Sequence, residues 1–139
     1  MSAVGAERAY FGRRVGLSAS HRLHSNALSV EENRAAFGKC NNPAGHGHNY
    51  EVQVSVVGKP SADGVLVNLP ELERVVGRTV IDRFDHKHLN IEVAEFADLN
   101  PTVENIARII FGLLKPVVAN LASVTVWETP KTWCEFSES

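Results

Sequence analysis

The chain has 139 residues, of which 44% are hydrophobic and 22% are charged, and its formal net charge is −2. This length suits a single domain, 1–139, and the sequence has neither an apolar run near the roughly 20 residues of a membrane span nor the basic patch of a nucleic-acid-binding protein. Two cysteines are too few for a disulfide framework, so we expect a reducing compartment, the cytoplasm. Residues 1–8 are small and polar, and we expect them to be disordered.

The first half of the chain predicts two strands joined by a long connection. In residues 10–21 and again in residues 46–57, apolar side chains recur at every second position, as in half-buried strands. The connection between them, 22–45, contains a candidate short helix near 29–37. Connections of this length in compact domains are often functional.

The middle of the chain predicts two helices, each with a capping residue. Asn68 can cap the first, with Glu71 three positions later, and apolar residues then follow at helical spacing as far as Val80. Thr102 can cap the second, which also has an apolar stripe and ends before Pro116.

The last third of the chain predicts a third strand at 123–129 and a short fourth strand at 133–136. The order of elements is then β-β-α-α-β-β. We expect an α+β fold with a four-stranded antiparallel sheet and two helices on one face. Such a sheet leaves two exposed edges, which a protein must cover or pair with another subunit.

Three histidines are expected to meet at one end of this sheet. His46 and His48 share a parity in the second strand, so they point to the same side. If the first two strands pair antiparallel, His21 lies beside them on the apolar face. Three neutral imidazoles suit zinc, and catalytic zinc sites often have three protein ligands and an open fourth position.

Cys40 precedes the His-Gly-His stretch by the five-residue spacer NNPAG. Structural zinc sites are closed and four-coordinate, so Cys40 could be a fourth ligand in a Cys-His₃ site. It could also stand close to the ion without binding it, and the spacing does not decide between these hypotheses. Ordinary core or surface histidines are the third interpretation, and His24 and His88 are expected at the surface.

Other candidate functional groups are acids and an adjacent acid–histidine pair. Asp85 beside His86 can orient the imidazole and set its tautomer, although a solvated loop is the alternative. Glu128 has the parity of the apolar residues in its strand, so it is either at a solvated strand end or meets a donor such as a heterocycle with adjacent N–H groups. Glu104 can complement the dipole of the second helix.

Five segments occur together in this order: SASH, FGKCNNPAGHGHNY, FDHKHLN, PTVEN and VWET. With them, the chain resembles the 6-pyruvoyl tetrahydropterin synthase family from about residue 10 to 130. The Cys-x₅-His-x-His motif with an upstream histidine is highly specific. The C-terminal segment KTWCEFSES is less similar to the family.

The resemblance implies three sets of site residues: His21, His46 and His48 for zinc; Cys40, Asp85 and His86 for catalysis; Glu128, Thr102 and Glu104 for substrate binding. In this set Cys40 is the general base and not a ligand. The implied architecture is the tunnelling fold, whose subunits join edge to edge into a trimeric barrel and stack as a homohexamer. Active sites then lie between subunits, so Cys40 would face Asp85 and His86 of a neighbour.

The implied activity is that of a zinc-dependent lyase in tetrahydrobiopterin biosynthesis, which converts 7,8-dihydroneopterin triphosphate to 6-pyruvoyl tetrahydropterin and triphosphate. It needs no external redox cofactor, and Mg²⁺ would accompany the triphosphate. A 6-carboxytetrahydropterin synthase is the nearest alternative, but its spacer between cysteine and His-x-His is typically shorter. A non-catalytic zinc-stabilised binding module is an alternative of another class. It would use Cys40 as a ligand and would unfold on chelation.

Overall fold

The structure is a computed structural model that describes residues 7–139, so residues 1–6 of the segment 1–8 that we expect to be disordered lie outside the described residues. The strands are β1 (Ala9–His21), β2 (His46–Gly58), β3 (Lys87–His88), β4 (Leu121–Thr129) and β5 (Thr132–Phe136). The α-helices are α1 (Val30–Phe37), α2 (Leu69–Val76), α3 (Asp82–Phe84), α4 (Leu89–Glu92) and α5 (Val103–Leu114). Short 3₁₀ turns cover Gly38–Asn41 and Ala94–Phe96, and a π-helical segment covers Gly77–Ile81.

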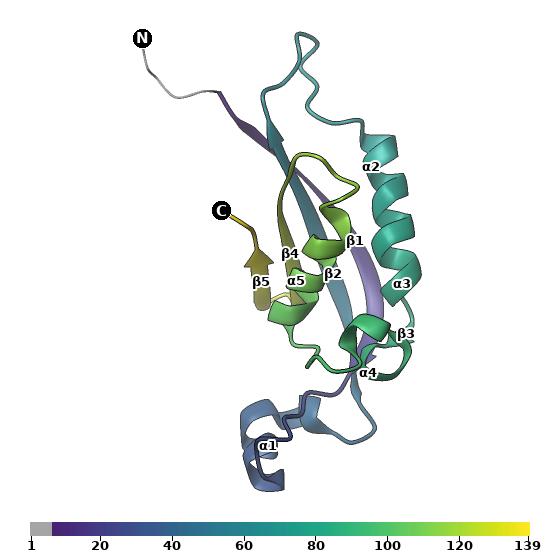
Figure 1. The fold of residues 1–139 in the computed structure, drawn as a ribbon, viewed down its shortest axis with the longest axis vertical. Coiled ribbons are helices and arrows are strands. Elements are labelled where there is room, and N and C mark those ends of the chain that lie inside the picture. The colour runs from purple at the N-terminus through teal and green to yellow at the C-terminus, as the bar shows by residue number, and fades with distance from the viewer. Residues whose placement is uncertain (1–6) are drawn as a thin grey trace.

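All five strands form one sheet in the order β3-β1-β2-β4-β5 (Figure 1). The four long strands pair antiparallel, as predicted, whereas β3 pairs parallel to β1. The expectation of a four-stranded, purely antiparallel sheet is therefore wrong. The reason is that β3 is only two residues long and pairs with Ala19 and Ser20 alone, so it has no alternating pattern that a sequence could reveal.

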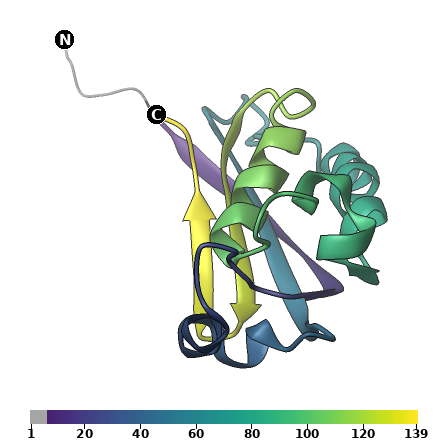
Figure 2. The same ribbon diagram turned by 60° about the horizontal axis from the view of Figure 1, so that its bottom comes forward.

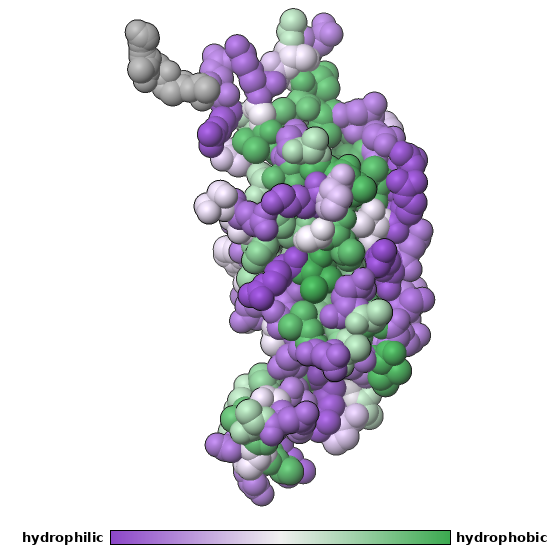
Figure 3. Space-filling view, in the orientation of Figure 1, coloured by the Kyte–Doolittle hydropathy of each residue, from purple (hydrophilic) through white to green (hydrophobic). Residues whose placement is uncertain are grey.

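The helices α2, α3 and α5 lie on one face of the sheet (Figure 2). The π-helical segment joins α2 to α3 in one continuous helical stretch. Between the helices and the sheet lies the core, to which β2 contributes Val52, Val54 and Val56 and α5 contributes Ile110 and Leu114. Hydrophilic side chains cover the outer flank of α2, and hydrophobic ones gather between the helices (Figure 3). Over residues 7–139, none of the helices is long and apolar enough for a bilayer crossing.

The predicted capping residues begin the helices that position the site. The Asn68 side chain accepts a hydrogen bond from the backbone N–H of Glu71 and caps α2. Likewise, the Thr102 side chain accepts one from the backbone N–H of Asn105 and caps α5. Because these side-chain oxygens satisfy N–H groups that a helix leaves unpaired in its first turn, each cap fixes where its helix begins.

Candidate metal centre

The strand register brings the three predicted histidines together. In the antiparallel β1–β2 pair, His21 lies opposite His46 and Ala19 lies opposite His48. The ring centroids of His21 and His48 are 5.0 Å apart, and those of His46 and His48 are 4.6 Å apart. The three rings therefore converge at one end of the sheet, as the alternation of side chains along the two strands predicts.

His21 has an imidazole nitrogen, Nε2, whose lone pair is available to bind a metal ion. The residue is 0% exposed, and its Nδ1 lies 2.8 Å from the backbone carbonyl oxygen of Pro101. Because a carbonyl only accepts hydrogen bonds, Nδ1 carries the hydrogen and Nε2 keeps its lone pair. Nε2 is buried and has no hydrogen-bond partner among the described residues. A carbonyl on the far nitrogen is the usual support of a metal-ligating histidine.

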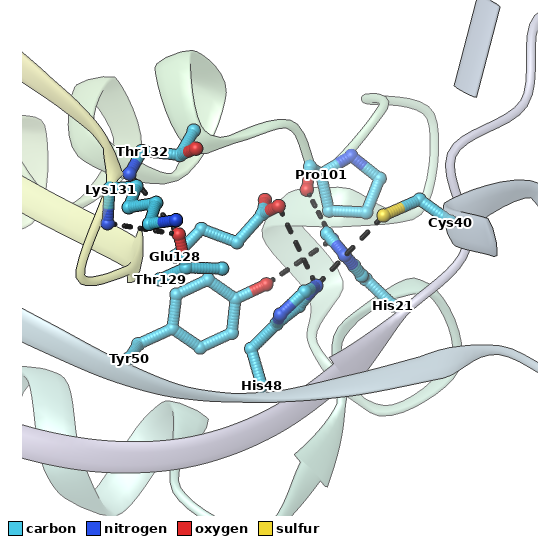
Figure 4. A network of polar contacts seen from close by, with 9 residues as sticks. All are labelled: His21, Cys40, His48, Tyr50, Pro101, Glu128, Thr129, Lys131 and Thr132. Carbon is cyan, nitrogen blue, oxygen red and sulfur yellow. Dashed lines mark hydrogen bonds and ion pairs between the residues drawn. The ribbon is translucent and has the colours of Figure 1, made fainter. Parts of the chain in front are cut away.

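His21, Cys40 and His48 form a group whose potential ligand atoms all lie within 4.8 Å of one another. Cys40 Sγ is 3.9 Å from His48 Nε2 (Figure 4). Zinc–sulfur and zinc–nitrogen bond lengths imply roughly 3.5 Å between adjacent ligand atoms of a tetrahedral site, so the group has about the size of a zinc site. His46 stands beside it, next to His48. The assignment of His46 as a ligand, and of Cys40 as a non-ligand, stays a prediction.

The protonation states favour a cation at this position. Burial lowers the pKa of His48 to about 4, with further lowering by His21 and His46. Burial also lowers the pKa of His21. Both imidazoles are therefore neutral near pH 7, which is the form that binds metals. Burial and the Glu128 carboxylate raise the pKa of the Cys40 thiol, so a nearby cation is needed to produce a thiolate. This donor set fits a divalent ion such as zinc.

Glu128 extends from the end of β4 into the same site. Its Oε1 is 3.6 Å from His48 Nε2, and its side chain is largely shielded from solvent. Burial raises the pKa of Glu128; His46 opposes this rise, and Glu104 adds to it. The alternative of a solvated strand end is therefore wrong. Glu104 itself is exposed in the first turn of α5. The side-chain oxygen of Thr102 accepts the hydrogen bond that caps this helix.

Asp85 and His86 lie at the edge of β1. Asp85 Oδ1 accepts a hydrogen bond from the Ser18 backbone N–H (2.8 Å), and its Oδ2 is 3.6 Å from His86 Nε2. The side chain of His86 is 81% exposed, and its backbone adopts a left-handed conformation (φ 60°) that non-glycine residues rarely adopt. Within residues 7–139, no hydrogen bond or ion pair joins this pair to Cys40.

Two groups of the site were not predicted from the sequence. Tyr50 is 2% exposed, and its hydroxyl oxygen is 3.3 Å from His21 Nδ1. Its parity with His46 and His48 is the signal that could have identified it. The carbonyl of Pro101 belongs to the backbone and has no side-chain signal. His88, expected at the surface, is half-buried, and a Cβ at Gly45 would lie only 2.8 Å from its Nε2.

Comparison with known proteins agrees with this geometry. The sequence model of the family described as 6-pyruvoyl tetrahydropterin synthase matches residues 11–139. The chain belongs to this family. The human 6-pyruvoyl tetrahydrobiopterin synthase is 46% identical over 135 residues, covering 93% of each chain. The structure of the Caenorhabditis elegans 6-pyruvoyl tetrahydropterin synthase superimposes with a TM-score of 0.88 at 38% identity, covering 96% of this chain and 97% of that one.

A more distant relative has a different name. The 6-carboxy-5,6,7,8-tetrahydropterin synthase of Haemophilus influenzae is 30% identical over 123 residues, covering 73% of this chain and 86% of that protein. Identity is thus higher to the relative named for the pyruvoyl product. The tunnelling fold expected from the sequence agrees with the match to the 6-pyruvoyl tetrahydropterin synthase structure.

Proposed function

We propose that this chain is a zinc-dependent lyase that converts 7,8-dihydroneopterin triphosphate to 6-pyruvoyl tetrahydropterin and triphosphate. One observation carries the proposal: Glu128 and Cys40 approach the same atom, His48 Nε2, at 3.6 Å and 3.9 Å. A carboxylate that can hold a heterocycle and a thiol that can move a proton therefore meet at one metal-binding group. Family membership across residues 11–139 supports the same reaction.

Glu128 is the proposed anchor of the pterin ring. A carboxylate can accept two parallel hydrogen bonds from adjacent N–H groups of a heterocycle, and such bonds offset the cost of its burial. Thr102 and Glu104, at the start of α5, are proposed to line the same end of the site. This arrangement would leave the side chain of the substrate directed towards His48 and Cys40.

Cys40 is the proposed general base. His21, His46 and His48 would hold a zinc ion, whose positive charge would acidify nearby C–H and O–H groups. Cys40 as thiolate then accepts a proton from the substrate side chain, and the triphosphate leaves from the neighbouring carbon. Hydrogens lost by the side chain are regained at the C6–N5 bond, so the reaction needs no external reductant. Mg²⁺ is proposed to neutralise the triphosphate.

Asp85 and His86 are proposed to serve the site of a neighbouring subunit as an acid/base relay. Both lie in the turn between α3 and β3, hydrogen-bonded to Ser18 of β1, and within residues 7–139 no hydrogen bond or ion pair joins them to Cys40. The free edges of the sheet, at β3 and β5, are where subunits would join. We propose the homohexamer of the family as the assembly in which the relay meets Cys40.

The direct test is turnover of 7,8-dihydroneopterin triphosphate by the purified protein, with product identification by mass spectrometry. We expect triphosphate release and a pyruvoyl product, lost on treatment with a chelator and restored by zinc. A carboxylated product would instead identify a 6-carboxytetrahydropterin synthase. Global unfolding on chelation, with no turnover in the loaded protein, would identify a zinc-stabilised binding module.

A further inference from the structure

Cys40 lies outside the sheet, yet its sulfur must be held at a fixed distance from His48. It belongs to the 3₁₀ turn Gly38–Asn41, within the long connection between β1 and β2. Most of its neighbours along the chain, among them Gly38, Lys39, Asn42 and Pro43, are exposed. A surface segment of this kind does not by itself fix a side chain to a fraction of an ångström.

Asn41 is the exception in this surface turn, because it is only 5% exposed. Its Nδ2 lies 2.7 Å from the backbone oxygen of Leu23 and 3.2 Å from His24 Nδ1. A carbonyl can only accept, so the amide nitrogen is the atom that faces Leu23. The same nitrogen then donates its second hydrogen to His24 Nδ1. Both donors of the amide are thus used within the protein.

Two backbone contacts complete the attachment. The N–H of Leu23 donates to the carbonyl of Cys40 at 2.7 Å, and Arg22 Nε donates to the carbonyl of Asn41 at 3.1 Å. Residues 22–24 follow His21 directly. Residues 22–24, which continue from β1 after the predicted ligand His21, are therefore hydrogen-bonded to the turn that carries the Cys40 thiol.

We infer that Asn41 is a positioning residue that sets where the Cys40 sulfur stands relative to His21 and His48. A buried amide with both donors satisfied holds the turn in one arrangement, whereas losing it leaves the carbonyl of Leu23 without that donor. Without the amide, the turn would remain tethered only by its backbone contacts. The thiol would then sample positions away from the histidines. The inference adds a residue to the proposed function and rests on it for its kinetic part.

The test compares Asn41→Asp with the matched control Asn42→Asp, both in a Cys134→Ser background so that Cys40 is the only thiol. The substitution Asn41→Asp keeps the shape of the side chain but replaces the donating NH₂ group with an acceptor oxygen. This oxygen would face two other acceptors, the carbonyl of Leu23 and His24 Nδ1. The control introduces the same charge one residue later, at an exposed site whose side-chain amide hydrogen-bonds, within residues 7–139, only to the carbonyl of Gly45 (3.3 Å). The measurements are zinc content, the rate of Cys40 alkylation by iodoacetamide in the zinc-loaded protein, and kcat and KM.

We expect Asn41→Asp to retain its zinc and to alkylate more slowly by about tenfold, because a thiol away from the cation is less often a thiolate. We also expect it to lose about tenfold or more in kcat with little change in KM, the scale of outer-shell substitutions at metal sites. The control should match the parent within about twofold. The inference would be overturned if Asn41→Asp had the alkylation rate and kcat of the parent protein. It would also be overturned if its kcat fell only in proportion to a loss of bound zinc. If Asn41→Asp does not fold, Asn41→Ser is judged by the same criteria. A parent without turnover counts against the proposed function, while the alkylation comparison still decides the role of Asn41.

Discussion

At the scale of single residues, the proposed mechanism depends on the thiol of Cys40. Burial and Glu128 raise the pKa of Cys40, so the thiolate requires the cation. We predict that Cys40→Ala keeps zinc and fold but lowers kcat by at least about 100-fold, because a general base contributes that much or more. Zinc content, circular dichroism and turnover check this. Cys134→Ala, at the other cysteine, is the control, and loss of zinc from Cys40→Ala would instead identify Cys40 as a ligand.

His48 gives a second prediction, for the metal-free protein. Its pKa falls from 6.5 to about 4 in the folded state, so between these pH values the unfolded chain binds more protons than the folded one. The free energy of unfolding should therefore fall as the pH drops from 6.5 towards 4, by on the order of 3 kcal/mol from this residue. Urea unfolding at pH 7.5 and 4.5 measures the change. In His48→Gln the dependence should be weaker by this amount, and an equal dependence in both proteins would contradict the prediction.

Residue patterns predicted the convergence of the histidines but not their supports. Alternation in β1 and β2 was enough to place His21, His46 and His48 on one face, since one parity rule governs both strands. The support of His21 comes from the carbonyl of Pro101, 2.8 Å away. Every residue has a carbonyl, and the contact joins positions 80 apart in the chain. Local sequence therefore could not identify Pro101 as the residue whose carbonyl contacts His21.

At the scale of elements, the start of α5 links helix capping to the site. Thr102 caps α5, and the preceding carbonyl, of Pro101, holds His21. We predict that Thr102→Ala lowers the free energy of unfolding by about 1 kcal/mol and also weakens zinc binding, whereas Thr102→Ser retains both. Urea unfolding and zinc competition with a chromophoric chelator measure the two effects. Asn68→Ala, at the cap of α2, should lower stability alone; zinc affinity unchanged in Thr102→Ala would show that cap and site are independent.

Elements were predictable where the pattern was long. Strands of the length of β1 and β2 repeat their alternation many times, and the apolar stripe of α5 covers several turns, so their positions agree with the predicted ranges. The two-residue strand β3 and the π-helical segment Gly77–Ile81 have no such repeat. Both depend on contacts with the rest of the fold. The missed parallel strand therefore reflects tertiary pairing, which here overrides local preference.

At the scale of the whole molecule, assembly is part of the proposed mechanism, because within residues 7–139 no hydrogen bond or ion pair joins Asp85 or His86 to Cys40. In the proposed assembly, each chain contributes Cys40 to one active site and Asp85 and His86 to another. The exposed edge strand β5, with Trp133 57% exposed, offers unpaired backbone groups for a second copy. The proposed hexamer can be checked by light scattering, but mass alone does not show that sites are shared.

Hexamers assembled from two different variant chains would show whether active sites are shared between subunits. Cys40→Ala and His86→Ala chains should each be inactive, and co-expression of the two should restore activity if a site takes Cys40 from one subunit and His86 from the next. With random combination of equal amounts, roughly a quarter of the sites contain both intact residues, so we expect about that share of wild-type activity. A mixture of Cys40→Ala with Cys40→Ser, in which no site has the thiol, is the control. Recovery no greater than in this control would place Cys40 and His86 in the same chain's site.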